Sequence, residues 1–313
     1  MKLLVSCPRG RTFDSFFDSR NIQLACELYD VVWNPYERNM TEKEAVDLII
    51  DCDVYMTTWG APPPTEAFFE ASKGLKTIAH LGYSAEAFIT DAVLNREVSV
   101  LSGEEYYFRS AAEGTLAYIL AALRAVPEFS QRLKYGSEWK HSWNSGRRLM
   151  DKTVGILNYN GISKRLIELL SVFKVNILVC DEKCNISEEE NLKKRIRQVD
   201  SKEMFSVSDV ICIHSPVGGG GYHTVGSELL YAIKSDALFV DTSIGGIVDR
   251  EALFGSLVQK NYTAVLDVYE SEPPAKNDPL ILLPNVIPMP HMAGPTPDVR
   301  PLIARELLIK CCR

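Results

Sequence analysis

The chain has 313 residues, of which 46% are hydrophobic and 24% are charged. Its formal net charge is −7, from 34 Lys and Arg against 41 Asp and Glu. These values exclude a fibre, a disordered tail protein and a small disulfide scaffold, and the length suggests two domains with a core each. An acidic protein repels phosphate backbones, so we expect no nucleic-acid partner.

The first residues do not resemble a targeting segment, and no stretch has the length of a membrane span. The apolar run after Met1 ends within a few residues at Pro8, whereas a secretory segment needs about 7–15 apolar residues. The most apolar stretch, residues 115–126, is interrupted by Arg124. It predicts a buried helix rather than a span of roughly 20 residues. We therefore expect no membrane partner.

The cysteines and histidines favour neither disulfides nor a metal site. Eight cysteines are present without a CxxC pair, and most lie in apolar runs, where a reduced thiol behaves as a small hydrophobic side chain. This usage is typical of the reducing cytoplasm, where we expect the protein to be located. The five histidines form no H-E-x-x-H motif and no i,i+4 pair, so we expect no metal.

In chain order, the first hundred residues alternate short β-rich runs with helical patterns. Strands are predicted at residues 2–7, 53–58, 76–80 and 98–101, which are rich in Val, Ile, Thr and Tyr. Thr41 followed by Glu44 has the spacing of a capping box and predicts the start of a helix. The alternation predicts a parallel sheet with helices on both faces.

The rest of the chain is more regular. A long helix is predicted at 104–130, a connecting loop at 135–150, a charged and solvated helix face at 187–198 and a last helix at 298–311. Six strands are predicted at 153–158, 175–180, 209–214, 237–242, 262–267 and 285–290. Helical patterns separate the first five of these strands, and such a block matches a doubly wound nucleotide-binding sheet.

A nucleotide-binding loop is predicted directly after the strand at 153–158. The three glycine positions of the G-x-G-x-x-G fingerprint hold Asn158, Asn160 and Ser163, with Gly161 one position out of register. Asparagine tolerates the left-handed backbone conformation that the turn requires, and serine is small enough for helix–strand packing. We expect the turn to be kept and the affinity for a dinucleotide to be weakened.

An acidic residue follows the second strand of this unit. Asp181 lies 18 residues after Ser163, and a carboxylate at about this distance commonly binds the adenosine ribose, which favours NAD over NADP. The alternative is a strand-terminal acid without a ligand. His214, at the end of a later strand, is either structural or lines the cofactor cleft.

Five segments in order resemble the D-isomer-specific 2-hydroxyacid dehydrogenase family. They are residues 151–183, 208–216, 239–253, 266–273 and 284–296. The first of these segments resembles the family's nucleotide-binding βαβ unit. The last three resemble the stretches that carry the family's catalytic arginine, glutamate and histidine. Residues 1–75 match the family only in their α/β pattern.

The resemblance implies an α/β fold with two doubly wound parallel-sheet domains. A Rossmann NAD-binding domain, residues 103–291, would be inserted into a flavodoxin-like substrate domain formed by 1–102 and 292–313. It also implies an active site in the cleft between the domains, and a homodimer formed largely through the nucleotide domain.

The family's chemistry can be carried over to this chain residue by residue. His291 would be the acid–base group and Glu270 its partner, since imidazole gains and loses a proton near neutral pH. The alternative for His291 is a loop histidine that caps a backbone carbonyl. Backbone N–H groups at Gly82, Tyr83 and Ser84 would bind the substrate carboxylate, and here the alternative is an ordinary strand–helix turn.

The cofactor would be NAD. Its implied binding residues follow the strand ends of the nucleotide domain: Asn158, Asn160, Gly161, Ile162, Asp181, His214, Thr242, Ser243, Ile244 and Asp267.

Two positions depart from the family's active-site pattern. The position of the catalytic arginine holds Ile244, which has neither a charge nor a donor for a substrate carboxylate. The family's asparagine six residues before the glutamate of its V-A-E segment, here Glu113, is replaced by Tyr107. Arg9, Arg11 and Arg109 are candidate substitutes for the lost arginine.

Two functions follow from this pattern. The first is an NAD-dependent oxidoreductase acting on the CH–OH group of a small 2-hydroxy acid, by reduction of the 2-oxo acid, with an activity impaired or altered in substrate. The alternative is a catalytically inactive nucleotide-binding or regulatory interaction protein on the same fold, which the loss of the arginine and of all three glycines favours.

Overall fold

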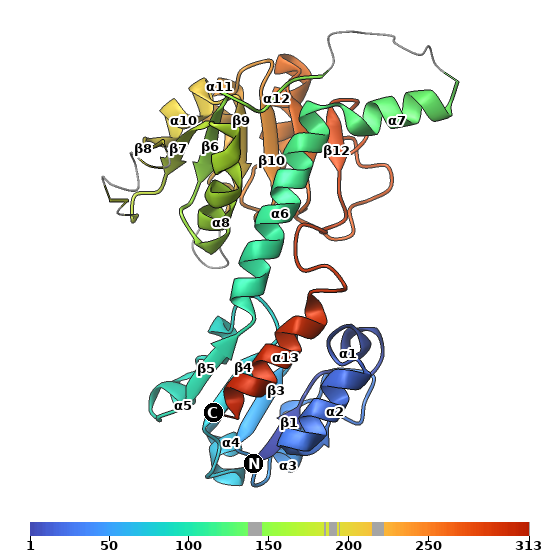
Figure 1. Cartoon of the computed structure of the whole chain (residues 1–313), viewed down its shortest axis with the longest axis vertical. Coiled ribbons are helices and arrows are strands. Elements are labelled where there is room, and N and C mark those ends of the chain that lie inside the picture. The colour runs from blue at the N-terminus through green and yellow to red at the C-terminus, as the bar shows by residue number, and fades with distance from the viewer. Residues whose placement is uncertain (137–145, 185, 188–192, 194, 215–221, 313) are drawn as a thin grey trace. The chain divides into compact units, whose positions relative to one another are not determined.

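The structure is a computed structural model that describes residues 1–136, 146–184, 186–187, 193, 195–214 and 222–312. Most of the predicted loop at 135–150 and part of the charged run at 187–198 lie outside these residues. The chain forms two compact units: Met1–Tyr107 with Pro295–Arg313, and Phe108–Gly294 (Figure 1). None of the helices in the described part is long and apolar enough to cross a membrane.

The first unit contains a five-stranded parallel sheet in the order β2-β1-β3-β4-β5, which is the flavodoxin-like order. Its strands are β1 (Lys2–Val5), β2 (Asp30–Trp33), β3 (Val54–Thr57), β4 (Thr77–His80) and β5 (Ser99–Ser102). Its helices are α1 (Arg11–Phe16), α2 (Ser19–Leu28), α3 (Glu42–Leu48), α4 (Glu66–Ala71), α5 (Asp91–Leu94) and α13 (Arg300–Cys311), with a 3₁₀ turn at Glu86–Phe88.

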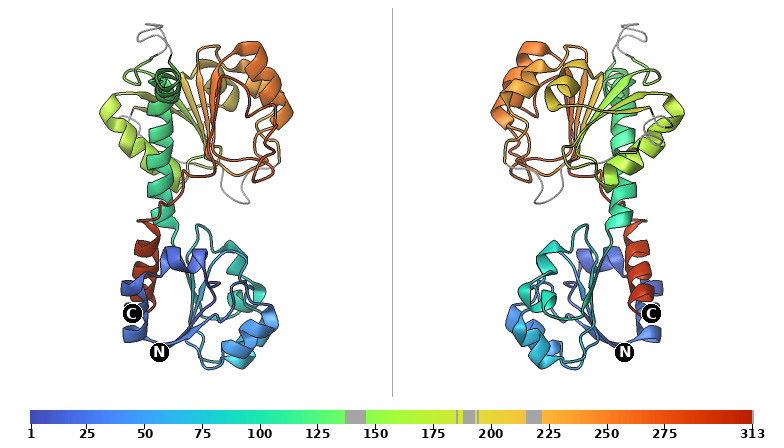
Figure 2. Two further views of the ribbon diagram at one scale, coloured as in Figure 1. Left: turned by 90° about the vertical axis from the view of Figure 1, so that its right-hand side faces the viewer. Right: turned by 90° about the vertical axis from the view of Figure 1, so that its left-hand side faces the viewer.

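Helices cover both faces of this sheet (Figure 2). Successive side chains of a strand point to opposite faces, and the strands therefore contribute to two cores. Leu3 and Val5 pack with α1, α2 and α13, whereas Leu4 packs with α3 and α4. The capping box predicted at Thr41 is confirmed, because the Thr41 side chain accepts from the Glu44 backbone and the Glu44 side chain accepts from the Thr41 backbone.

The second unit contains a seven-stranded parallel sheet in the order β12-β11-β10-β9-β6-β7-β8. Its strands are β6 (Thr153–Leu157), β7 (Asn176–Cys180), β8 (Ile196–Gln198), β9 (Val210–Ile213), β10 (Leu238–Asp241), β11 (Thr263–Leu266) and β12 (Val286–Pro288). Its helices are α7 (Val126–Lys134), α8 (Gly161–Leu170), α10 (Ser201–Val207), α11 (Ser227–Ala232) and α12 (Arg250–Lys260), with a 3₁₀ turn at Ser171–Phe173. The boundary between the units falls within α6 (Glu104–Leu123).

The strand order of the second unit is that of the Rossmann fold with one strand added beside β11. Two apolar cores again flank the sheet. One contains Val154 and Ile156 of β6 with residues of α6 and α8, and the other contains Ile211 and Phe239 with residues of α10, α11 and α12. The predicted fold class, a Rossmann domain inserted into a flavodoxin-like domain, is thus confirmed.

Three local predictions differ from the structure. The helix predicted at 104–130 is two helices, because Ala125 adopts a left-handed conformation with φ of 50° between α6 and α7. Strand β2 was not predicted. Strand β8 lies within the charged run for which a helix face was predicted; Ile196 is buried against the core while Arg197 and Gln198 remain exposed.

Candidate active site

The loops that follow β6, β9, β10 and β11 emerge at one edge of the second sheet, because all of its strands are parallel. The residues expected to bind a cofactor follow these strand ends. Hydrogen bonds directly join the loops after β6, β9 and β10.

The loop after β6 keeps the turn expected from its asparagines. Asn158 adopts a left-handed conformation with φ of 70°. Asn160 caps α8, where its Oδ1 accepts from the Ser163 backbone N–H at 3.1 Å. Ser163 is fully buried and its hydroxyl donates to the Asn158 carbonyl. Gly161 begins α8 beside the ring of Phe108. The asparagine side chain at position 160 is therefore engaged within the loop.

Asp181 is tied to the same loop. Its Oδ2 accepts from the Tyr159 backbone N–H and its Oδ1 from the Lys183 backbone N–H, each at 2.9 Å. A carboxylate has about four lone-pair sites, so two remain for ribose hydroxyls. Ile162, the next expected cofactor residue, is only partly buried and packs against the core on the α8 side.

His214 lies at the centre of a hydrogen-bonded group after β9. Its Nδ1 is 3.0 Å from Thr242 Oγ1, and that hydroxyl is 3.2 Å from Thr115 Oγ1. The backbone carbonyl of His214 accepts a hydrogen bond from Asn160 Nδ2. The ring is buried, and burial lowers the pKa of His214 to about 4. Its Nε2 is buried without a hydrogen-bond partner among the described residues.

These residues fit a dinucleotide. The turn that brings backbone close to a pyrophosphate is present at Asn158, and the Asp181 carboxylate has capacity for further hydrogen bonds. The buried Nε2 of His214 lacks a partner within the part of the chain that the structure describes. A buried polar atom without a partner is rare in proteins, and a bound ligand or water commonly supplies one.

His291 is paired with a carboxylate other than the one expected. Its Nδ1 lies 2.7 Å from Glu272 Oε2, so the predicted pairing of His291 with Glu270 is wrong. His291 is exposed and its φ is 56°, a left-handed value that costs free energy outside glycine and is frequent at functional sites. Both glutamates lie in the irregular loop after β11, where no strand alternation fixes the direction of a side chain.

Glu270 contacts a second histidine. Its Oε1 lies 2.7 Å from His223 Nε2, and His223 Nδ1 lies 4.0 Å from Asp249. Glu272 and His223 were both missed by the sequence reasoning. The E-S-E spacing gave the signal for Glu272, but nothing in the sequence linked His223 to Glu270. No group of three or more His, Cys, Asp or Glu side chains that could hold a metal ion is found among the described residues.

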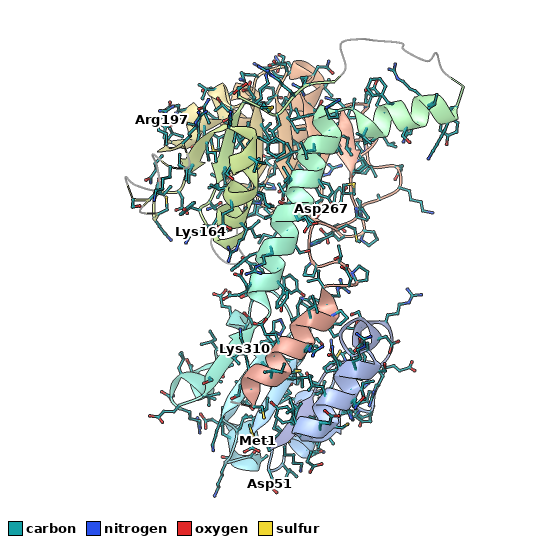
Figure 3. All side chains as sticks on the ribbon, in the orientation of Figure 1. Met1, Asp51, Lys164, Arg197, Asp267 and Lys310 are labelled. Atoms are coloured by element: carbon teal, nitrogen blue, oxygen red, sulfur yellow. The ribbon has the colours of Figure 1, made fainter. Side chains whose placement is uncertain are left out.

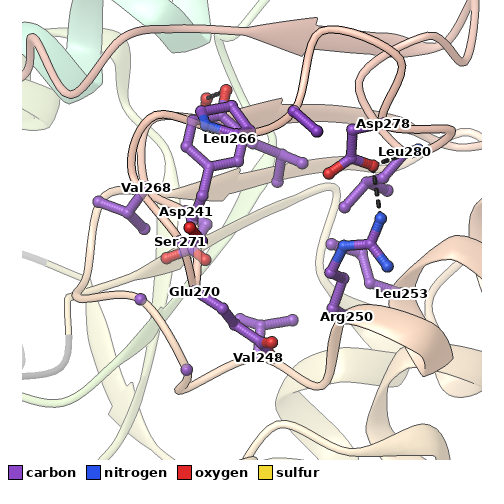
Figure 4. A pocket seen from close by; sticks show the side chains of 15 residues that line it. Asp241, Val248, Arg250, Leu253, Leu266, Val268, Glu270, Ser271, Asp278 and Leu280 are labelled. Atoms are coloured by element: carbon purple, nitrogen blue, oxygen red, sulfur yellow. Dashed lines mark hydrogen bonds and ion pairs between the residues drawn. The ribbon is translucent and has the colours of Figure 1, made fainter.

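Glu270 also lines a pocket of about 300 Å³ (Figure 4). The loop after β10 forms one wall with Gly245 and Gly246, and the segment from Val268 to Leu280 forms another. Arg250 projects into it and donates to Asp278 at 2.5 Å. His291 and Glu272 are not among its lining residues.

Asp267, labelled in Figure 3, holds the chain that follows His291. Its Oδ1 accepts from the Met292 backbone N–H at 2.7 Å and from the Tyr118 hydroxyl at 2.9 Å, and its Oδ2 accepts from the Ala293 N–H at 2.9 Å. Charge-assisted hydrogen bonds of this kind are about twice as strong as neutral ones. Asp267 therefore fixes the backbone on the C-terminal side of His291.

The loop after β10 is built around buried polar groups and one apolar side chain. The Ser243 hydroxyl and backbone N–H both donate to Asp241 Oδ1, at 2.6 and 3.1 Å. Ile244, at the position of the expected arginine, packs against the core that contains Phe239. Its side chain thus adds to the apolar core and offers no hydrogen bond.

In the first unit, the expected substrate loop follows β4. The Cβ of any residue replacing Gly82 would lie 2.3 Å from His80 Nε2, so this position requires glycine. Ser84 Oγ accepts from the Glu86 backbone N–H at 3.2 Å, and the ring of Tyr83 lies 6.2 Å from that of Tyr107. His80 donates to or accepts from Thr57 at 2.9 Å, and burial lowers its pKa to about 4.

Comparison with known proteins identifies the second unit. The family model for the D-isomer specific 2-hydroxyacid dehydrogenase, NAD binding domain, matches residues 116–293. A D-3-phosphoglycerate dehydrogenase of Methanocaldococcus jannaschii is 30% identical over 263 residues, covering 83% of this chain. The chain spans only about half, 49%, of that relative's length.

Two further similarities extend over most of both chains. A hydroxypyruvate reductase of Thermotoga maritima is 28% identical over 275 residues, which cover 87% of this chain and 88% of the relative. The crystal structure of D-mandelate dehydrogenase from Rhodotorula graminis superimposes with a TM-score of 0.81 at 16% identity, covering 98% and 92% of the two chains. The latter likeness supports the fold alone.

The pKa of Asp241 gives a prediction for stability. Burial, with a smaller contribution from the charge of Asp267, raises the pKa of Asp241 from 3.8 to about 6. The protonated form therefore stabilises the fold below about pH 4, and this stabilisation, roughly 2–3 kcal/mol, is lost as pH rises through about 6. We expect Asp241→Asn to be more stable than wild type at pH 7.5 and to lose this advantage at pH 4.5, in urea unfolding.

Asp236→Asn is the control, because Asp236 is exposed. It should change stability equally little at both pH values. An Asp241→Asn effect of the same size at pH 4.5 and 7.5 would contradict the raised pKa.

Proposed function

Because the chain belongs to the D-isomer-specific 2-hydroxyacid dehydrogenase family, we propose that it is an NAD-dependent oxidoreductase that interconverts a small 2-hydroxy acid and the corresponding 2-oxo acid. The 2.7 Å contact between His291 and Glu272 carries this proposal. It provides an exposed imidazole oriented by a carboxylate, which is what proton transfer to a substrate oxygen requires. The name of one sequence relative, hydroxypyruvate reductase, refers to an acid of this class.

His291 is the proposed acid–base residue. Its Nδ1 faces Glu272, so Nε2 is the ring atom that exchanges a proton with the substrate oxygen. Glu272 fixes the ring orientation and stabilises the imidazolium form through a charge-assisted hydrogen bond. Asp267 is the proposed positioning residue, since it holds the backbone of Met292 and Ala293 directly after the histidine.

The cofactor is proposed to bind at the carboxyl edge of the second sheet. The loop from Asn158 to Ser163 would hold the pyrophosphate at the start of α8, and Asp181 would bind the adenosine ribose. The remaining proposed contacts come from Ile162, His214, Thr242, Ser243, Ile244 and Asp267. When bound, the nicotinamide cofactor supplies or accepts a hydride.

The substrate carboxylate is proposed to meet the loop at Gly82, Tyr83 and Ser84, which follows a strand end of the first unit. We assign this unit, approximately residues 1–102 with 292–313, to the substrate and residues 103–291 to NAD. A cytoplasmic location is proposed as well. The burial of Cys7, Cys52, Cys212 and Cys311 as free thiols supports it.

A second candidate function is favoured by Ile244. An apolar side chain packed into the core at the position of the catalytic arginine also suits a protein that binds a nucleotide and regulates a partner without catalysis. This candidate requires cofactor binding but neither His291 nor Glu272.

A homodimer is also proposed, and α7 supports it. This helix has no buried residues, and its apolar side chains Val126, Phe129 and Leu133 are 53%, 39% and 59% exposed. The three lie three and four residues apart and therefore share one helix face. A second copy of the chain is the proposed cover for this face.

Glu272→Gln tests the proposed catalysis, with NADH consumption measured over a panel of 2-oxo acids. We expect Glu272→Gln to lower kcat by about 10-fold to 100-fold, because it removes the carboxylate that supports the acid–base group. We expect His291→Ala to lower kcat by about 10²–10⁴-fold, because it removes the acid–base group itself. Glu270→Gln is the matched control, two residues away in the same loop, and should stay close to wild type. Equal effects of the two glutamine variants would contradict the assignment of Glu272.

NADH binding distinguishes the enzyme from a protein without a cofactor. Titration of the full chain with NADH, followed by protein fluorescence, should show saturable binding. Asp181→Asn should weaken it by about tenfold, because a hydrogen bond to a charged group contributes about 1.5–3 kcal/mol. No binding at millimolar NADH would contradict both candidates. Binding without turnover of any 2-oxo acid, in wild type and His291→Ala alike, would favour the regulatory one.

The oligomeric state can be measured by size-exclusion chromatography with light scattering. We expect a species of twice the chain mass of 35.0 kDa. The double variant Phe129→Glu and Leu133→Glu should elute as a monomer, because two carboxylates on the apolar face would be desolvated in the interface. A single 35.0 kDa species for the wild type would contradict the dimer.

A further inference from the structure

An aromatic cluster surrounds the substrate loop of the first unit. Trp59 lies 5.9 Å from Phe16 and 6.4 Å from Tyr107, measured between ring centroids, and Tyr83 lies 6.2 Å from Tyr107. The Tyr107 hydroxyl donates to the Leu81 carbonyl at 3.4 Å, one residue before the loop. Trp59 is 47% exposed, so the cluster has an accessible side.

Arg300 belongs to this cluster. Its guanidinium carbon lies 6.0 Å from the centre of the Phe16 ring. Burial raises the pKa of Tyr107, and the positive charge of Arg300 opposes that rise. One turn further along α13, Ile303 packs close to Gly103, which in turn donates a backbone hydrogen bond to the Gly82 carbonyl. The first turn of α13 is therefore anchored beside the substrate loop.

The charge of Arg300 has no ion-pair partner among the described residues of the unit. None of the ion pairs among the described residues includes it, and its Nε is buried without a hydrogen-bond partner. It is also the first residue of α13, where the helix dipole disfavours a cation. An unpaired donor of this kind is destabilising in the isolated fold. These costs are offset if an anion binds there.

Three other arginines of the unit are already engaged. Arg9 stacks on Phe13 at 4.3 Å and on Trp33 at 5.3 Å, and its Nε donates to the Asn34 carbonyl. Arg38 and Arg96 form ion pairs with Glu44 and Glu66.

We propose that Arg300 binds the substrate carboxylate, and that Trp59, Tyr83 and Tyr107 contact the substrate side chain. This rests on the proposed oxidoreductase function. A planar guanidinium pairs with a carboxylate through two parallel hydrogen bonds. Aromatic faces bury apolar groups and offer nothing to a phosphate. The substrate class is a 2-oxo acid with an apolar or aromatic side chain.

The test compares Arg300→Gln with Arg305→Gln, using phenylpyruvate and glyoxylate as substrates. Arg305 is exposed in the same helix and carries the same charge, so it is the matched control. We expect Arg300→Gln to raise KM for phenylpyruvate by at least 30-fold, the loss typical of removing a charged partner, with NADH affinity unchanged. Arg300→Lys should recover part of that loss, and Arg305→Gln should resemble wild type.

Two further readouts separate a binding role from a structural one. Arg300→Gln should unfold at the same temperature as wild type or at a higher one, because the unpaired charge is removed. A lower melting temperature together with an unchanged KM for phenylpyruvate would overturn the proposal. Wild type should prefer phenylpyruvate over glyoxylate, and Trp59→Ala should reduce that preference. A preference for glyoxylate in the wild type would overturn the aromatic contact.

Binding of oxamate, a carboxylate that cannot be reduced, distinguishes the failure of this proposal from the failure of the proposed function. Turnover by wild type with equal oxamate affinity in wild type and Arg300→Gln would overturn the role of Arg300 and leave the oxidoreductase intact. Absence of turnover with every 2-oxo acid, together with absence of oxamate binding, would overturn both.

Discussion

The parallel pairing of β6 with β7 and β9, and of β9 with β10, is the constraint on which the proposed cofactor site depends. Parallel strands place all their carboxyl ends at one edge, so residues far apart in the chain meet there. Asn160 reaches the His214 carbonyl and His214 reaches Thr242 only because the loops after β6, β9 and β10 share that edge. An antiparallel partner in the middle of the sheet would separate them.

Carboxylates hold the proposed acid–base residue, His291, at two points. Glu272 contacts the imidazole of His291, and Asp267 binds the backbone that follows it. The left-handed conformation of His291 is held by these contacts at both the side chain and the neighbouring backbone. The neighbouring pair of Glu270 and His223 uses the same chemistry on another side of the loop, next to a separate pocket.

Ile244 lies where the family resemblance leads us to expect an arginine. An isoleucine can pack where a guanidinium would have to be solvated or paired, and Ile244 does pack against the core of the second unit. In the first unit, Arg300 takes part in none of the ion pairs of the described residues, and its buried Nε has no hydrogen-bond partner among them. The buried Nε of Arg300, which lacks a hydrogen-bond partner among the described residues, is the observation from which we inferred a carboxylate anchor in this unit.

The sequence by itself determined the fold class, ten of the twelve strands found in the described residues, and the turn after β6. Strand periodicity, capping residues and the conformational tolerance of asparagine are local properties of the chain. It missed β2 and β8, which are edge strands whose side chains are mostly half-buried or exposed, so that neither has a buried apolar run. In the candidate site, His291 and the strand-end positions stay predictions, whereas the partner predicted for His291, Glu270, differs from the Glu272 that it contacts.

Only the tertiary structure decided which side chains meet. Glu270 and Glu272 are two residues apart in a loop without regular geometry, so the backbone path alone selects the one that faces His291. Arg300 was invisible in the sequence as a site residue, because a cation near a helix start is ordinary until its lack of a partner is seen. Pairing depends on distances between segments far apart in the chain, and local sequence patterns do not contain those distances.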